Sequence, residues 1–152
     1  MSRAFVNEDR FAEEMPDRPV SPHPNLVTER GLVQIESELE AVRRAYGEAQ
    51  AAGDRDALAK AGRELRYWSA RRASAELHAH DPANSTVQFG STVTISRDDG
   101  RVQSFRIVGE DEADPSQGSI SYVSPLARAL LGKGVGEAVQ AGQTEAEITG
   151  VA

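Results

Sequence analysis

The feature that most constrains the fold is a pair of heptad stretches separated by a Gly-Asp break. In these stretches, mostly apolar residues recur at alternating spacings of three and four, first over residues 32–49 and again over residues 58–75. They are Leu32, Ile35, Leu39, Val42, Tyr46 and Ala49, then Leu58, Ala61, Leu65, Trp68, Arg72 and Ala75. Such spacing places a stripe on one face of a helix, and the break at Gly53-Asp54 predicts two helices folded back as an antiparallel coiled coil. Thr28 can cap the first helix, because its hydroxyl can accept a hydrogen bond from a first-turn N–H.

The residues before this hairpin differ in composition. Four prolines fall between Pro16 and Pro24, and acidic residues alternate with basic ones. Proline stops a helix and holds the preceding residue extended. We therefore expect residues 1–24 to form a disordered or polyproline-like tail, followed by the hairpin over residues 25–81. Two roles stay open for the tail, which are a passive one and a docking one.

Beyond residue 82 the apolar period changes to two. Residues 92–95 and 104–107 alternate around the turn signal Asp98-Asp99-Gly100, which predicts a β-hairpin. Ser124 suits the N-cap of a short helix from Pro125 to Leu131. Further strands are expected over residues 120–123, 135–139 and 145–151. Residues 82–152 are thus predicted to form an α+β domain, an antiparallel sheet packed by one short helix. We expect its core to comprise Phe89, Val93, Ile95, Phe105, Ile107, Ile120, Leu126, Leu130, Leu131, Val139 and Ile148.

Charge and composition exclude several classes of protein. A net charge of −7 argues against strong independent nucleic-acid binding, because neutralising phosphates requires clustered Lys and Arg. It is compatible with an electropositive protein partner. The chain has no cysteine, which excludes disulfides and cysteine-ligated zinc. No apolar run approaches a membrane span, and residues 1–17 lack a signal-peptide core. We therefore expect a cytoplasmic protein that does not interact with membranes, and we also expect it to be a monomer.

Two motifs that suggest a ligand fail on spacing. The segment Gly132-Lys133-Gly134 has Ala127, not glycine, five residues before its Gly-Lys pair and no Ser or Thr after it, unlike a phosphate-binding loop. His78 and His80 are two residues apart and have no other His or Cys near them in sequence, so a hinge is favoured over a metal site. No arrangement of Ser, His and Asp indicates nucleophilic catalysis.

Two acidic positions have both a structural and a functional interpretation. Asp54 and Asp56 lie at the hairpin break, where Asp is a normal turn residue. Two exposed carboxylates can also help to hold a divalent cation whose other ligands come from a partner, and Mg²⁺ held this way could activate water. Residues 110–114 contain four carboxylates, either as a solvated turn or as a patch that meets a basic protein.

Three phrases in a fixed order, at residues 87–94, 105–114 and 124–133, resemble the C-terminal domain of the GreA/GreB transcript-cleavage factors. Residues 25–31 are similar to the start of the coiled coil in that family, so the resemblance covers residues 25–152. It implies an FKBP-like fold for the C-terminal domain. It also implies a protein that is not itself an enzyme but acts on bacterial RNA polymerase. The coiled coil would enter the secondary channel, and the tip acids would support cleavage of backtracked RNA with Mg²⁺ shared with the polymerase.

The resemblance also assigns residues, with one departure at the tip. The polymerase-binding residues it implies are Asp111, Glu112, Asp114, Ser124 and Pro125. Asp54 matches the first tip acid of the family. The second acid of the family lies three residues later, where this chain has Ala57, and Asp56 comes one residue early. The hairpin allows about 24 helical residues, or ~36 Å, roughly two turns less on each side than the arms of the family.

Several activities remain open. Within the family, the chain could stimulate cleavage, or it could bind the channel as a regulator or inhibitor without cleavage. An FKBP-like prolyl isomerase needs an apolar, aromatic-lined cavity, for which the domain offers only Phe89, Phe105 and Tyr122. A third alternative is a binding module that regulates another enzyme, such as a nucleotide kinase.

Overall fold

The computed structural model describes residues 16–152, which fall into two compact units. The first, called here the hairpin unit, contains residues 16–24 and Val33–Ala75. The second, the sheet unit, contains Asn25–Leu32 and Glu76–Ala152. The boundary expected between residues 81 and 82 therefore lies inside the sheet unit, and the start of the first helix belongs with the sheet.

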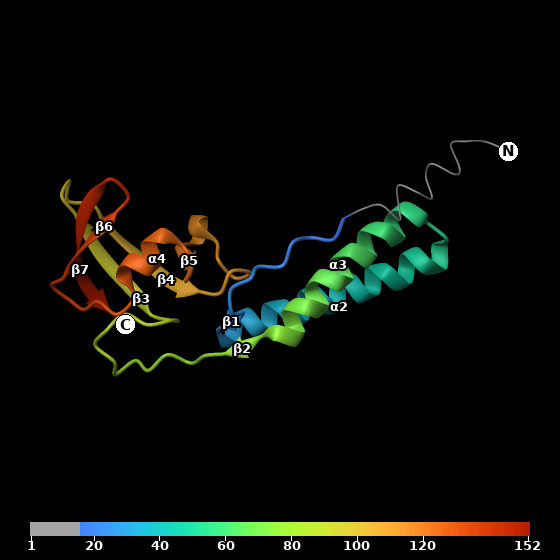
Figure 1. Ribbon diagram of the computed structural model, residues 1–152, viewed down its shortest axis with the longest axis horizontal. Coiled ribbons are helices and arrows are strands. Elements are labelled where there is room, and N and C mark those ends of the chain that lie inside the picture. Colours follow the sequence, from blue (N-terminus) through green and yellow to red (C-terminus); the bar gives the residue numbers. More distant parts are fainter. Residues whose placement is uncertain (1–15) are drawn as a thin grey trace. The chain divides into compact units, whose positions relative to one another are not determined.

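The helical hairpin is confirmed. Helix α2 runs over Glu29–Ala52 and helix α3 over Arg55–Ser74, and Figure 1 shows them side by side. At 1.5 Å per residue, the 24 residues of α2 extend ~36 Å, as expected from the sequence. The tail expected over residues 1–24 is described only from Pro16, and residues 16–24 form neither helix nor strand.

Most of the heptad stripe is buried or half-buried between the helices, with one exception near its end. Ile35, Leu39 and Trp68 are buried, as the pattern predicts. Arg72 was expected in the stripe but is exposed, and its Nε lies 3.0 Å from Glu36 Oε1 on α2. A long side chain can carry its charge from an apolar stripe to water, which accounts for this difference. The neighbouring Arg71 is only 2% exposed, which the heptad pattern does not predict.

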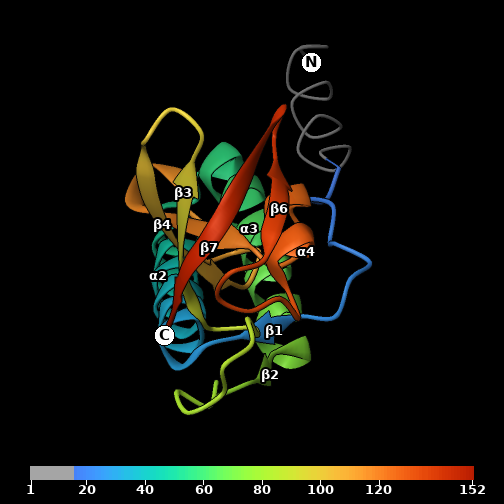
Figure 2. The same ribbon diagram turned by 90° about the vertical axis from the view of Figure 1, so that its left-hand side faces the viewer.

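The sheet unit is built on five strands in the order β5-β4-β3-β7-β6. Their bounds are Thr92–Arg97 (β3), Val102–Val108 (β4), Ser119–Ser121 (β5), Ala138–Ala141 (β6) and Thr144–Val151 (β7). Helix α4, Pro125–Leu130, is one residue shorter than predicted and packs near β6. Figure 2 shows the twist of this sheet, with β7 crossing the view at a steep angle. The α+β class is confirmed.

The prediction that the sheet is wholly antiparallel was wrong. Strands β4 and β5 pair in parallel, while the other pairs in this sheet are antiparallel. Parallel neighbours need a connection that returns the chain to its starting end. Residues 109–118 make that return and include the 3₁₀ turn η1, Pro115–Gln117. The acidic segment is therefore the crossover between two strands and not a simple hairpin turn.

A second, two-stranded sheet was missed by the sequence analysis. Strand β1, Leu26–Val27, pairs in parallel with β2, Glu76–Leu77. The loop after β4 approaches β1 so closely that a Cβ on Gly109 would lie 2.3 Å from the Leu26 carbonyl oxygen. Only glycine permits such an approach of two backbones. Within residues 16–152, no helix combines the length and apolar character needed to cross a bilayer.

The core of the sheet unit agrees with most of the predicted residues. Its buried members are Val87, Val93, Ile95, Ile107, Ile120, Ala127, Leu130, Val139, Ala141, Ala146 and Ile148. Phe105, Leu126 and Leu131 are only partly buried against this cluster. Phe89, expected in the core, is half-buried beside it, with edge-to-face contacts to Tyr122 at 5.7 Å and to His78 at 6.2 Å between ring centroids.

Candidate functional site

The hairpin tip consists of a two-residue connection between the helices. Gly53 adopts a φ of 65°, which ends α2 in the left-handed conformation that glycine accepts most readily. The Gly53 N–H bonds to the Gln50 carbonyl at 3.3 Å, and the Asp54 N–H bonds to the Ala49 carbonyl at 3.1 Å. This pair of bonds is a Schellman motif, which satisfies the last carbonyls of α2 and turns the chain sharply.

Asp54 is both the end of this motif and the N-cap of α3. Its Oδ1 accepts a hydrogen bond from the Ala57 N–H at 3.1 Å. Asp56 lies in the first turn of α3 and is exposed, as is Asp54. Within residues 16–152, no group of three or more His, Asp or Glu side chains is placed to hold a metal ion. The described tip therefore offers two carboxylates, one of them engaged in capping, and does not form a complete Mg²⁺ site by itself.

The acidic crossover contains one residue that is turned inward. The Glu112 side chain is 6% exposed, and its Oε2 lies 3.2 Å from a guanidinium nitrogen of Arg106 on β4. Its Oε1 accepts a hydrogen bond from the Thr28 hydroxyl at 2.5 Å. A Cβ on Gly31 would lie 2.7 Å from the same oxygen, so the carboxylate packs directly on the first turn of α2. Glu112 thus joins three separate segments of the sheet unit.

Thr28 fulfils its predicted capping role and adds a second bond. Its hydroxyl oxygen accepts a hydrogen bond from the Gly31 N–H at 3.0 Å while donating to Glu112. The sequence analysis found the cap from local pattern but not the partner, which is 84 residues away. No local signal could have revealed it, because the bond depends on how β1 and the crossover pack.

Three of the other residues implied for polymerase binding, Asp114, Ser124 and Pro125, lie at element starts, whereas Asp111 lies within the crossover. Asp114 caps η1, with its Oδ1 accepting from the Ser116 N–H at 3.1 Å. Ser124 caps α4, with its hydroxyl accepting from the Ala127 N–H at 3.3 Å, and Pro125 takes the first helical position. Pro125 and Asp114 are exposed, Asp111 and Ser124 are half-buried, and Glu112 is engaged inside the unit. The roles of all five in binding stay predictions.

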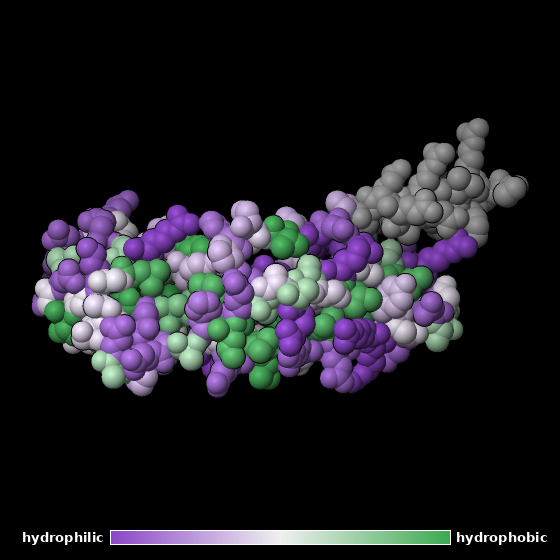
Figure 3. Space-filling view, turned by 60° about the horizontal axis from the view of Figure 1, so that its bottom comes forward, coloured by the Kyte–Doolittle hydropathy of each residue, from purple (hydrophilic) through white to green (hydrophobic). Residues whose placement is uncertain are grey.

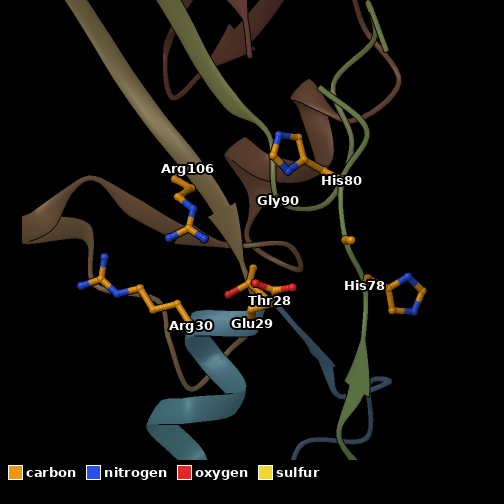
Figure 4. A pocket seen from close by; sticks show the side chains of 8 residues that line it. Thr28, Glu29, Arg30, His78, His80, Gly90 and Arg106 are labelled. Carbon is orange, nitrogen blue, oxygen red and sulfur yellow. The ribbon is translucent and has the colours of Figure 1, made fainter. Parts of the chain in front are cut away.

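An open groove of about 350 Å³ lies beside the Thr28 network within the sheet unit. It is lined by Thr28, Glu29, Arg30, His78, Ala79, His80, Gly90 and Arg106. Figure 4 shows the His80 ring near Gly90, while the His78 ring points away from the Thr28 and Arg106 side chains. The two imidazoles therefore do not converge on one point. The groove combines cationic groups with the Glu29 carboxylate, and no single ligand chemistry follows from its lining.

A helical hairpin with an exposed acidic tip and a sheet unit with an acidic crossover define a class of protein that combines a coiled-coil hairpin with an α+β unit. Comparison with known proteins makes this class specific. The family model "Transcription elongation factor, GreA/GreB, C-term" matches residues 82–151, which include the crossover and α4.

Full-length relatives extend the match over the hairpin. The chain is 33% identical over 149 residues to the transcription elongation factor GreA of Desulfovibrio desulfuricans, covering 88% of this chain and 92% of that protein. It is 30% identical over 135 residues to GreB of Haemophilus ducreyi, covering 76% and 83%. The chain belongs to the GreA/GreB family of transcription elongation factors. Both relatives are named for a role in transcription elongation.

Solved structures show a weaker likeness. The crystal structure of GreA factor homolog 1 (Gfh1) of Thermus thermophilus matches 86% of this chain and 99% of that chain, with 19% identity and a TM-score of 0.43.

Proposed function

We propose that this protein binds bacterial RNA polymerase in the cytoplasm as an elongation factor. The sheet unit docks at the rim of the secondary channel, and the helical hairpin enters the channel. The observation that carries this proposal is the family match over residues 82–151, which contains both the acidic crossover and the Ser124-Pro125 helix start.

The distribution of charge supports a basic partner surface. Residues 75–152 contain 11 Asp and Glu but five Lys and Arg, so most of the net negative charge lies in this part of the chain. Opposite charges on two surfaces accelerate association and favour the correct orientation. On the face drawn in Figure 3, strongly hydrophilic residues lie over the helical hairpin at the right, with smaller apolar groups among them. Such a surface suits an arm that enters a hydrated channel.

Binding is tested with charge-matched variants. Asp111→Lys is expected to weaken binding to core polymerase, because it reverses a charge in the proposed docking surface. Glu145→Lys changes the net charge equally on exposed residue 145 of β7 and serves as the control. Pro125→Ala removes an exposed ring while leaving the Ser124 cap in place, and it is also expected to weaken binding. Equal dissociation constants for wild type and the Asp111 and Pro125 variants would contradict this docking surface.

Two activities of the bound protein remain to be separated. In the first, Asp54 and Asp56 contribute carboxylates to a Mg²⁺ ion completed by polymerase, where the metal would activate water for hydrolysis of backtracked RNA. In the second, the protein occupies the channel without promoting cleavage. The two exposed tip carboxylates support the first, whereas the spacing of Asp56 and the ~36 Å length of α2 support the second.

Backtracked transcription complexes distinguish these activities. Asp54→Ser retains an oxygen that can cap α3 but removes the charge, and Asp56→Asn removes the other carboxylate with little change in shape. If the protein stimulates cleavage through its tip, the double variant loses RNA shortening while still binding polymerase. Equal shortening by wild type and variant would remove the tip acids from the mechanism. Binding without shortening by wild type would identify a non-cleaving regulator.

A further inference from the structure

The described part of the N-terminal segment is bound along α3. Residues 16–18 make one polar contact each with that helix. The Pro16 carbonyl accepts from Arg63 Nε at 2.8 Å, Asp17 Oδ1 accepts from Arg66 Nε at 2.7 Å, and an Arg18 guanidinium nitrogen donates to Glu64 Oε2 at 2.6 Å. Contacts from three successive residues hold the segment against residues 63–66 of the helix. They lie within the hairpin unit.

Arg18 makes the most specific of these contacts. Its guanidinium carbon lies 3.7 Å from the Tyr67 ring centroid and 5.8 Å from that of Trp68. The two rings meet edge to face, with centroids 5.0 Å apart. A cation over aromatic faces is attracted by the ring quadrupole, and the Glu64 carboxylate adds a charge-assisted hydrogen bond. Glu64, Tyr67 and Trp68 therefore form a guanidinium-binding site on α3.

The position of this segment divides the hairpin into two parts. Arg63 lies eight residues beyond Arg55, the first residue of α3, which corresponds to ~12 Å along the helix axis. Between the tip and this point, the described arm consists of two helices. From Arg63 onward, residues 16–18 lie against α3 as a third segment of the same chain, which widens the cross-section of the arm.

We propose that residues 16–18 form a strap that limits how far the hairpin can insert into its partner. The strap is held by the guanidinium-binding site of Glu64, Tyr67 and Trp68. This inference rests on the proposed function, because insertion requires a channel. A channel that fits two helices does not admit the arm together with the strap, so insertion beyond Arg63 requires the strap to leave α3. Strap release thus regulates the depth that the acidic tip reaches.

The geometry explains why the strap can be displaced. The Arg18 and Glu64 side chains are 33% and 36% exposed, and those of Arg66 and Asp17 are 56% and 63% exposed. Exposed ion pairs are individually weak and are screened by salt. The stacked Arg18 guanidinium is therefore the main specific contact, and lysine cannot replace its planar stacking.

Strap binding is tested first in the isolated protein. Trp68 is the only tryptophan, so its fluorescence reports on the guanidinium-binding site. Arg18→Ala is expected to shift the emission to longer wavelength and to increase quenching by acrylamide. Arg18→Lys should resemble it. Arg43→Ala, which removes an exposed arginine from α2, serves as the control and should leave the spectrum unchanged. A spectrum that is identical in wild type and the Arg18→Ala variant would overturn the guanidinium-binding site.

Insertion is then tested with core polymerase. Loss of the Arg18 contact should lower the dissociation constant about fivefold, since the strap no longer has to be displaced, and Arg43→Ala should not change it. Altered fluorescence with an unchanged dissociation constant and unchanged RNA shortening would show that the strap exists but does not limit insertion. If neither wild type nor the variants bind polymerase, the proposed function and the insertion limit both fail, while the fluorescence result still decides the guanidinium-binding site.

Discussion

The Thr28 hydroxyl donates a hydrogen bond to the Glu112 carboxylate at 2.5 Å, joining the start of α2 to the crossover after β4. Glu112→Ala leaves the buried Thr28 hydroxyl and Arg106 without this carboxylate. We expect the free energy of unfolding to fall by about 1–3 kcal/mol. Glu112→Gln keeps an acceptor for the Thr28 hydroxyl, so its free energy of unfolding should fall by less than that of Glu112→Ala. Urea unfolding of both variants measures the difference, and equal stability of the alanine variant and wild type would contradict a structural role.

Gly109 and Gly47 form a matched pair of glycines for substitution. A Cβ at residue 109 would lie 2.3 Å from a backbone oxygen, whereas at residue 47 no heavy atom lies within 4 Å. Gly109→Ala should therefore destabilise the protein strongly, by ~3 kcal/mol or more, because backbone must move. Gly47→Ala should stabilise it by about 1 kcal/mol through helix propensity. Thermal unfolding measures both, and a neutral Gly109→Ala variant would mean that β1 can shift at little cost.

Arg71 and Arg72 are adjacent but are expected to differ in their effect on stability. Arg71 is 2% exposed, whereas the Arg72 ion pair with Glu36 has side chains that are 45% and 50% exposed. Arg72→Ala should change the free energy of unfolding by less than ~1 kcal/mol, because exposed pairs contribute little. Arg71→Ala should cost ~2 kcal/mol or more, since it removes a buried side chain and its packing. Denaturant unfolding compares the two, and the reverse order would contradict the burial of Arg71.

Asp54 should affect helix stability independently of any role in cleavage. Asp54→Ala removes the acceptor for the Ala57 N–H and should lower stability by about 1 kcal/mol. Asp54→Ser should retain most of the stability that Asp54→Ala loses, because serine is an equally good N-cap. Circular dichroism during thermal unfolding measures the difference. If alanine and serine behave alike, the cap contributes nothing at this position.

Asp99 in the β3–β4 turn should titrate below its ordinary range. Hydrogen bonds from the Arg101 backbone N–H and side chain, with the charge of that arginine, hold the pKa of the Asp99 carboxyl below its ordinary value of 3.8. A carboxylate with a lowered pKa in the folded state stabilises the protein above the pKa of the unfolded state. This contribution is lost as the pH falls through the folded pKa. Carboxyl NMR titration of wild type and Arg101→Ala measures it, and the variant should show a pKa nearer to 3.8.

The patterns that could be predicted from sequence are those set by neighbours along the chain. Both helices of the hairpin followed from the heptad spacing, and the α4 cap followed from Ser124 and Pro125. The strand pair β3–β4 followed from its alternation around the Asp98–Gly100 turn. In each case, the physical cause lies within a few residues, as helix periodicity, capping or turn geometry.

What the sequence determined by itself was the family, the hairpin and the α+β class of the second half. The tertiary structure alone decided that β5 lies parallel to β4, that β1 pairs with β2, and that Glu112 faces inward to Thr28. It also placed Arg18 on Tyr67, in a segment for which composition predicted only a tail. These features depend on contacts between residues 13 to 84 positions apart, whose free energies arise only when the packed segments meet. No local pattern in the chain records them.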